Sequence, residues 1–216
     1  MSELLIKGAL AYLLGSIVGS LLIGRLAGGV DIRSLGSGNA GATNALRTLG
    51  KKVAFCVFVI DVAKGWIATG WLVFATLPAV AAASPEWRAW GTPVCGLAVM
   101  LGHVYPVWYG FRGGKGMATL VGAVLGVSPW LLLPMIVTWL ATVVISGFVG
   151  LASILASCAL AVALAVTSAA APLRAFGIAA ALLVLFTHRS NIARMRAGTE
   201  SRARRLWLLG RRTGQA

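Results

Sequence analysis

The chain turns between two apolar segments at Gly102-His-Val-Tyr-Pro-Val-Trp-Tyr-Gly-Phe-Arg-Gly-Gly-Lys-Gly-Met-Ala-Thr119. An apolar run reaches Pro106, a glycine-rich basic loop follows at residues 112–116, and a second apolar run begins at Met117. Glycine has no Cβ, so the backbone N–H groups of such a loop can approach an anion closely. A helix beginning at Met117 would direct its partly positive N-terminus at the same place. The stretch therefore predicts a phosphate-binding loop between two membrane helices.

The candidate phosphate ligands of this loop are consecutive: Arg112, Gly113, Gly114, Lys115 and Gly116. The loop is not a Walker P-loop, because that motif requires a Gly separated by four residues from its Gly-Lys pair, and Ser or Thr after the Lys. Here Tyr109 and Gly116 stand at those positions. The alternative interpretation is a flexible basic turn, which the excess of Lys and Arg in cytoplasmic loops produces in many membrane proteins.

The composition is that of an integral membrane protein. Of the 216 residues, 59% are hydrophobic and only 11% are charged. Apolar runs of about 20 residues recur, which is the length that crosses the core of a bilayer. We therefore predict an all-α, polytopic membrane helix bundle that forms a single domain over residues 1–216. The first apolar run lacks a cleavage site of the signal-peptide type and is expected to be retained as a helix.

The net charge of +14 does not indicate a nucleic-acid partner, because the basic residues gather in loops between the apolar runs. There they orient the protein and meet anionic lipid head groups, so the lipid bilayer is the expected partner. The three cysteines, Cys56, Cys95 and Cys158, lie within apolar runs at spacings that fit no metal site. No metal and no cofactor are therefore expected. The oligomeric state is not set by the sequence, and a monomer is compatible with it.

Seven membrane spans are predicted, with boundaries at about residues 4–26, 53–77, 92–109, 117–128, 130–146, 151–168 and 173–187. Seven spans place the two termini on opposite sides of the membrane. The loop 28–52, the loop 112–116 and the tail 188–216 then share one side, and they hold most of the Lys and Arg. The positive-inside rule places this side, with the C-terminus, in the cytoplasm and the N-terminus outside.

A second glycine-rich stretch on the predicted cytoplasmic face is Leu35-Gly-Ser-Gly-Asn-Ala-Gly-Ala-Thr-Asn-Ala-Leu-Arg47. Its loop can present N–H and hydroxyl donors, and its Thr43 and Arg47 share one face if a helix follows. The alternative is a flexible loop without a ligand. The candidate binding residues of this stretch are Ser37, Gly38, Asn39, Thr43, Asn44 and Arg47.

A third polar stretch, His188-Arg-Ser-Asn-Ile-Ala-Arg-Met-Arg-Ala-Gly-Thr-Glu200, follows the last predicted span. If that span continues as a helix, its residues His188, Asn191 and Arg194 align on one face. The alternative for His188 is an interfacial histidine without a catalytic role. Two glycine-rich loops, several cations and a histidine on one face indicate two phosphorylated ligands, one of them with an apolar tail.

Two charged residues, Asp61 and Lys64, fall inside the predicted span 53–77 at a spacing of i, i+3. We interpret them as a pair that neutralises itself within the bundle. A functional role stays open, because charges inside a membrane are costly. For His103, near the end of the next span, one interpretation is a simple hydrogen bond to a backbone carbonyl.

The three polar stretches closely resemble the three motifs of the bacterial membrane acyl-phosphate:glycerol-3-phosphate acyltransferases, the PlsY family. The matching segments are Gly36-Ser-Gly-Asn-Ala-Gly-Ala-Thr-Asn44, Gly102-His-Val-Tyr-Pro106 with Phe111-Arg-Gly-Gly-Lys-Gly-Met-Ala-Thr119, and His188-Arg-Ser-Asn-Ile192 with Gly198-Thr-Glu200. The resemblance runs through nearly the whole chain in order and spacing.

The resemblance implies a multi-pass protein of the bacterial cytoplasmic (inner) membrane with its active site on the cytoplasmic face. It implies transfer of a fatty acyl group from acyl phosphate to the 1-hydroxyl of glycerol 3-phosphate. The products are lysophosphatidic acid and phosphate, in the first acylation of phospholipid synthesis. In agreement, neither His103 nor His188 has an Asp five positions later, so the His-x4-Asp motif of the other acyltransferase class is missing.

Residue roles are implied by the same resemblance. The expected acyl-phosphate ligands are Ser37, Gly38 and Asn39, and the expected ligands of the glycerol 3-phosphate phosphate are Arg47 and Lys115. The expected active-site pair is His188 and Asn191, with either His188 or a substrate phosphate oxygen as the base. Ser153 aligns with a family serine, but the segment Ser146-Gly-Phe-Val-Gly-Leu-Ala-Ser153 lacks the Arg-Tyr-Val-Ser typical of that position.

An alternative function from another class is a transporter of phosphate or an organophosphate. Transporters also bind anions at broken helices and helix N-termini. They need a site near the middle of the membrane that opens to both sides, often within inverted repeats. We find no internal repeat in the sequence, and the polar stretches share one predicted face.

Overall fold

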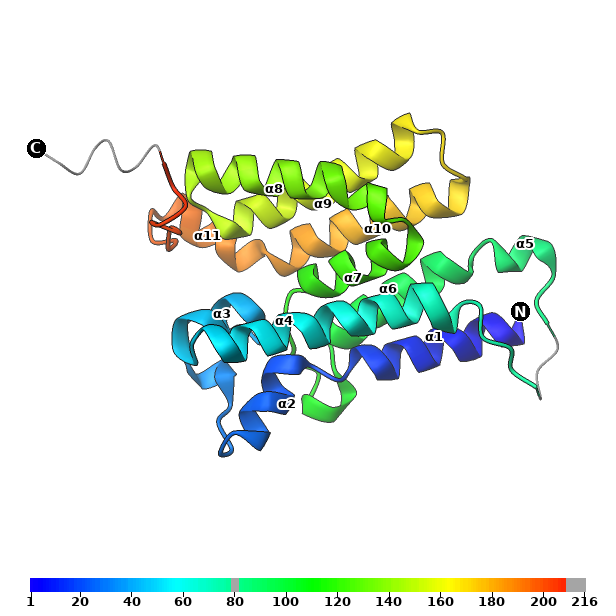
Figure 1. Cartoon of the computed structure of the whole chain (residues 1–216), viewed down its shortest axis with the longest axis horizontal. Coiled ribbons are helices and arrows are strands. Elements are labelled where there is room, and N and C mark those ends of the chain that lie inside the picture. Colours follow the sequence, from blue (N-terminus) through cyan, green and yellow to red (C-terminus); the bar gives the residue numbers. More distant parts are fainter. Residues whose placement is uncertain (79–81, 209–216) are drawn as a thin grey trace, which may run out of the picture. The chain divides into compact units, whose positions relative to one another are not determined.

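The computed structural model describes residues 1–78 and 82–208, and the regular secondary structure within these ranges is helical (Figure 1). The chain divides into two compact units, Met1–Pro129 and Trp130–Ala216, which we describe one at a time. The single-domain prediction stays a prediction. The first unit contains α1 (Ser2–Gly15), α2 (Gly19–Leu26), α3 (Ala42–Thr48), α4 (Lys51–Trp66), α5 (Pro85–Arg88), α6 (Gly91–Val104) and α7 (Met117–Val127). The second contains α8 (Leu132–Ser146), α9 (Val149–Val166), α10 (Ala171–Thr187) and α11 (Arg189–Arg196).

Within the described residues, three helical segments are long and apolar enough to cross a membrane: Lys51–Leu72, Pro129–Ser146 and Val149–Val166. The first is α4 continued by a π-helical stretch, Ile67–Leu72. The number of spans rises to five if the bent pairs α1 with α2 and α10 with α11 each form one span. The predicted fourth span, 117–128, corresponds to α7, which is one of the shorter apolar helices. The all-helical prediction is confirmed for the described residues, whereas the number seven stays a prediction.

The predicted first span, 4–26, is not one continuous helix. It breaks between Gly15 and Gly19, and the two helices meet at an angle of 45°. The break has a tertiary cause. Lys64 and Asp61 of α4 bond to backbone groups that a continuous helix would have satisfied internally.

The condition set for the third polar stretch, a last span that continues as one helix, is not met. The chain bends by 52° where α10 ends and α11 begins, and His188 occupies the bend. His188 therefore lies outside α11, immediately before its first residue, whereas Asn191 and Arg194 lie within that helix.

Glycines bring the helices of the first unit into close contact. A Cβ at Gly15 of α1 would collide with the carbonyl of Val99 on α6, and a Cβ at Gly102 would collide with α1 in return. The same relation holds between α4 and α7, where a Cβ at Gly65 or Gly122 would strike the backbone of the other helix. Small residues allow such close approach of membrane helices. The beginning of α7, and with it the loop 112–116, is thereby fixed against α4.

In the second unit, α9 packs against α8, α10 and α11. The chain after α11 returns to the end of α8, where Ala203 N–H donates to the carbonyl of Gly147 at 2.8 Å. The guanidinium of Arg202 lies 4.4 Å from the ring of Phe148 and 4.1 Å from that of Trp207. The predicted basic tail is thus docked through residue 208, and residues 209–216 lie outside the described residues.

Candidate functional site

The first loop (residues 37–41) is shaped by the side chain of Asn44, which is 2% exposed. The Asn44 carbonyl oxygen accepts the N–H of Ser37 at 2.9 Å, and its amide donates to the carbonyls of Leu35 and Ile32 at 2.9 and 3.2 Å. Gly36 has φ +56°, and a Cβ there would collide with Asn44. Asn44 therefore determines the path of the first loop, while its predicted contact with substrate stays a prediction.

Fewer backbone donors of the first loop face outward than the sequence suggested. The N–H of Ser37 bonds to Asn44, and the N–H of Gly38 bonds to the carbonyl of Leu35 at 3.0 Å. The hydroxyl of Ser37 and the side-chain amide of Asn39 are side-chain donors of this loop that suit a ligand. The following residues form α3, as predicted, and its exposed Thr43 and Arg47 share one face of that helix.

The second loop (residues 112–116) begins by closing the end of α6. The N–H groups of Gly113 and Gly114 donate to the carbonyls of Val104 and His103, at 3.0 and 3.1 Å. The expectation that these two N–H groups converge on an anion is therefore wrong. The last carbonyls of a helix have no partner within it, and here the glycines supply the missing donors. An anion bound at this loop must therefore contact residues that follow Gly114.

The later residues of the second loop fit an anion. Gly116 has φ +83° and precedes α7, so the first N–H groups of α7 have no acceptor within their own helix. Lys115 is half-buried immediately before this helix start. Lys115 therefore directly precedes, in sequence, a helix start that carries partial positive charge.

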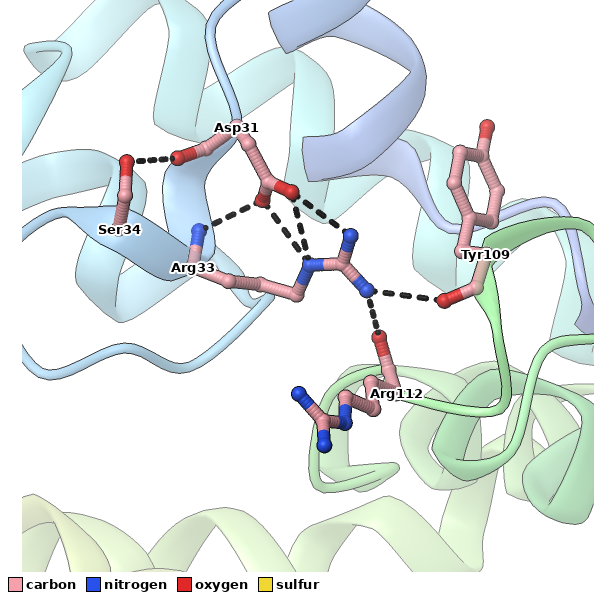
Figure 2. A network of polar contacts seen from close by, with 5 residues as sticks. All are labelled: Asp31, Arg33, Ser34, Tyr109 and Arg112. Carbon is pink, nitrogen blue, oxygen red and sulfur yellow. Dashed lines mark hydrogen bonds and ion pairs between the residues drawn. The ribbon is translucent and has the colours of Figure 1, made fainter.

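The two loops meet within the first unit. A Cβ at Gly114 would lie 2.5 Å from the carbonyl oxygen of Ala40, so only glycine allows this approach. Arg33 joins the same two segments, because its Nη1 donates to the carbonyls of Tyr109 and Arg112, both at 2.9 Å. Figure 2 shows the guanidinium of Arg33 lying between Asp31 and these carbonyls. The sequence showed Arg33 only as one of many basic loop residues.

Asp31 orients Arg33 from the other side. Its carboxylate accepts from Nε at 2.9 Å and from Nη2 at 2.7 Å, and the backbone N–H of Arg33 adds a bond at 2.9 Å (Figure 2). The hydrogen bonds from Arg33 hold the pKa of Asp31 below its ordinary value. The same pairing raises the pKa of Arg33. Both groups are therefore charged at neutral pH, and the guanidinium donates to the Asp31 carboxylate through both Nε and Nη2.

In the second unit, His188 is 4% exposed at the bend between α10 and α11. Its Nδ1 lies 2.8 Å from the carbonyl oxygen of Val184. A carbonyl can only accept, so Nδ1 carries the proton and the lone pair of the neutral ring is on Nε2. This is the tautomer that a histidine base requires.

Asn191 and Arg194 converge on Glu200, a residue whose role the sequence did not indicate. Asn191 Nδ2 and Arg194 Nε donate to the two carboxylate oxygens of Glu200, each at 2.6 Å. A Cβ at Gly150 would crowd the Asn191 side chain, at 2.8 Å from its Nδ2. Glu200 thus fixes the direction of the Asn191 amide against the start of α9.

The predicted Ser153 lies in α9, with its hydroxyl bonded to the carbonyl of Val149 at 3.0 Å. The residues predicted from the sequence are therefore distributed over the two units in two groups. One group consists of the two loops and α3 in the first unit. The other consists of His188, Asn191 and Ser153 in the second unit.

Comparison with known proteins identifies the fold and the sequence pattern. A family model described as glycerol-3-phosphate acyltransferase matches residues 5–198. The chain belongs to the glycerol-3-phosphate acyltransferase family. The enzyme of that name from Bordetella pertussis is 42% identical over 198 residues, covering 89% of this chain and 88% of that protein. The enzyme from a Synechococcus strain is 40% identical over 202 residues, covering 94% and 96%.

A crystal structure of PlsY (YgiH), an integral membrane glycerol 3-phosphate acyltransferase in its glycerol 3-phosphate form, matches with a TM-score of 0.82. It is 39% identical and covers 92% of this chain and 94% of that one. The form with lysophosphatidic acid matches with a TM-score of 0.79 at 38% identity. The protein is thus a multi-pass membrane acyltransferase that acts on glycerol 3-phosphate, and the transporter alternative is not favoured.

Proposed function

We propose that this acyltransferase takes its acyl group from an acyl phosphate and transfers it to the 1-hydroxyl of glycerol 3-phosphate. An acyl phosphate is an activated mixed anhydride, so no covalent enzyme nucleophile is needed. The attacking hydroxyl oxygen forms the new ester bond, the carbonyl–phosphate bond breaks, and inorganic phosphate leaves. The hydroxyl proton goes to His188 Nε2 or to a phosphate oxygen of the substrate. The enzyme must then hold two anions together and stabilise the developing oxyanion.

The observation that carries this proposal is the meeting of two anion-type loops at Gly114, beside Lys115 and the start of α7. One loop offers hydroxyl and amide donors, and the other offers a cation and a helix N-terminus. We assign Ser37, Gly38 and Asn39 to the acyl phosphate, with Ser37 and Asn39 as side-chain donors and Gly38 as the turn residue between them. We assign Lys115 and Arg47 to the phosphate of glycerol 3-phosphate, with Arg112, Gly116, Thr43 and Asn44 around them.

We assign catalytic roles to His188 and Asn191 of the second unit. The lone pair on His188 Nε2 suits a proton acceptor, and the amide of Asn191, oriented by Glu200, suits a group that positions a hydroxyl or a phosphate. Ser153 is assigned to substrate binding. The segment before Ser153 lacks the Arg-Tyr-Val-Ser of the family. Substitution of Ser153 is therefore the weakest test of the proposal.

The donor is tested with purified protein, radiolabelled glycerol 3-phosphate and one acyl source at a time. Palmitoyl phosphate should give labelled lysophosphatidic acid with one equivalent of phosphate released. Palmitoyl-CoA and palmitoyl acyl carrier protein should give none. Product from either thioester at a comparable rate would refute the acyl-phosphate donor and leave the acceptor unchanged.

The site is tested with Lys115→Ala. Loss of a charge-assisted bond of about 1.5–3 kcal/mol should raise KM for glycerol 3-phosphate at least about tenfold. The protein should insert and elute as a single species. A folded variant with normal kinetics would remove Lys115 from the site.

For the topology, we propose seven spans, with the N-terminus outside and the C-terminus in the cytoplasm. The site then opens to the cytoplasm, where glycerol 3-phosphate is available. The supporting feature is the clustering of Lys and Arg in the loop 28–52, the loop 112–116 and the segment after α10. In a bacterium the corresponding membrane is the cytoplasmic (inner) one.

A further inference from the structure

Three ionisable side chains lie buried in the first unit, next to the second loop, and none of them belongs to the site assigned above. This buried cluster consists of Asp61 and Lys64 of α4 and His103 of α6, exposed by 1%, 3% and 3%. Lys64 Nζ lies 2.9 Å from Asp61 Oδ1 and 2.8 Å from His103 Nδ1. The alternative of a ring bond from His103 to a backbone carbonyl is not the arrangement found, because its Nδ1 faces Lys64. Charges at such depth in a membrane protein are costly and mark functional positions.

On one side, the buried cluster holds the break between α1 and α2. Lys64 Nζ donates to the carbonyls of Gly15 and Ile17 at 3.0 and 2.8 Å. Asp61 Oδ1 accepts the N–H of Gly19 at 3.2 Å. Bonds with an ionised partner are stronger than bonds between neutral groups. The direction in which the chain leaves α1 toward the first loop therefore depends on this ion pair.

On its other side, the buried cluster contacts the second loop through His103. The backbone carbonyl of His103 accepts the N–H of Gly114 at 3.1 Å. Its ring lies so close that a Cβ at Gly114 would collide with Nε2. Since Ala40 approaches Gly114 as well, this glycine is enclosed between the imidazole and the first loop. Lys115 is the next residue.

The bonds also set the orientation of the imidazole. A protonated lysine has no lone pair and only donates, so Nδ1 of His103 accepts from Lys64. The neutral ring then carries its proton on Nε2, the nitrogen that faces Gly114. Lys64 itself is held by Asp61 and two carbonyls. A continuous series of contacts therefore leads from the break in the first span to the residue before Lys115.

We propose that Asp61, Lys64 and His103 are positioning residues for acyl transfer, and that they set the place of Gly114 and hence the direction of Lys115. The inference rests on the assignment of Lys115 to the phosphate of glycerol 3-phosphate. It goes beyond a self-neutralising pair, because such a pair would stabilise the bundle without affecting substrate binding. Paired substitutions separate the two roles.

Lys64→Met alone leaves Asp61 buried without its cation, and removal of one partner of a buried pair is strongly destabilising. The double variant Asp61→Asn/Lys64→Met removes both charges and should recover much of the wild-type yield and Tm in detergent. We expect its KM for glycerol 3-phosphate to stay at least about tenfold above wild type. If the double variant recovers its yield and Tm and also has the wild-type KM, the inference is overturned.

His103→Asn provides a second test that does not depend on the folding of the double variant. The oxygen of Asn can stand where Nδ1 stands and accept from Lys64, but the side chain does not reach Gly114. The fold should be retained and KM should again rise about tenfold. A folded His103→Asn variant with wild-type KM contradicts the positioning role.

A matched control exists at the other end of α1, where Lys7 Nζ lies 2.8 Å from Glu3 Oε1 and Lys7 is 6% exposed. Glu3→Gln/Lys7→Met should leave KM within about twofold of wild type, and a comparable rise would reveal general loosening and defeat the inference. Lys115→Ala separates a failure of the proposed phosphate site from a failure of the positioning role. Normal kinetics in Lys115→Ala refute the proposed site, whereas a raised KM there with normal double and His103→Asn variants refutes only the positioning role.

Discussion

Replacement of Arg33 by lysine should loosen the contact between the two loops while keeping the positive charge. The Arg33 guanidinium holds Asp31 through Nε and Nη2 and two carbonyls through Nη1, those of Tyr109 and Arg112 (Figure 2). An ammonium group is a single point charge and lacks the planar fork that serves both sides at once. Arg33→Lys therefore keeps the charge near Asp31 and loses the bonds to the second loop.

The size of the effect follows from two bonds and their exposure. A hydrogen bond from a charged donor is worth about 1.5–3 kcal/mol when buried. The Arg33 side chain is 26% exposed, so solvent screening reduces this contribution. We estimate that the two bonds stabilise the observed position of the second loop by about 1–2 kcal/mol. This is a factor of roughly 5–30 in the equilibrium constant between the bonded and the released loop.

The assay is the initial rate of lysophosphatidic acid formation at varied glycerol 3-phosphate. KM for glycerol 3-phosphate should rise in Arg33→Lys, with roughly 30-fold as the upper limit, because the binding-competent loop is less populated. The matched control is Arg88→Lys, since Arg88 Nε also donates to a carbonyl, that of Ala83 at 2.8 Å, in a segment far along the chain from either loop. An unchanged KM in folded Arg33→Lys, or an equal rise in Arg88→Lys, would refute the reasoning.

Three further predictions concern catalysis, topology and pH. His188→Gln should lower kcat by roughly 10²–10⁴ with little change in KM, and near-normal turnover would move the proton to a substrate phosphate oxygen. In a background without native cysteines, Ser84→Cys should react with an impermeant thiol reagent in intact cells and Ala197→Cys should not, and the reverse pattern would contradict the proposed orientation. The pKa of Asp31 lies below its ordinary 3.8 because Arg33 bonds it, so its pairing stabilises the fold above that pH and is lost as pH falls further. Asp31→Asn should therefore lower Tm at pH 7, with a difference from wild type that vanishes in strong acid, and a constant difference would exclude this pairing.

The sequence predicted the position of the second loop and the start of α7 well, because glycines, a proline and a change in hydropathy mark both. It did not predict which N–H groups are available there. The sequence shows that Gly113 and Gly114 can approach an anion, but it does not show that α6 ends with carbonyls at Val104 and His103 that need those donors. Competition between two uses of one donor is settled only in three dimensions.

The break in the first span illustrates the same limit. Hydropathy over residues 4–26 fits one helix, and the glycines at 15 and 19 are equally compatible with close packing or with a bend. The bend is favoured because it exposes the carbonyls of Gly15 and Ile17, and the ammonium of Lys64, far along the chain, donates to both. Asn44 and Arg33 are similar, since each was visible as a polar residue while its partners were not.

The polar side chains of the first unit act more on its backbone than outward. Asn44 shapes the first loop, Arg33 holds the carbonyls of the second, and His103 encloses Gly114 between both. This distribution fits the proposed chemistry, because an activated acyl phosphate requires placement of two substrates and not a covalent nucleophile. Substitution of Asn44, Arg33 or His103 should therefore raise KM for glycerol 3-phosphate as much as substitution of some residues that contact the substrate. Turnover should depend chiefly on His188, since a group that takes the proton acts in the transition state, whereas a group that places a loop acts whenever substrate binds.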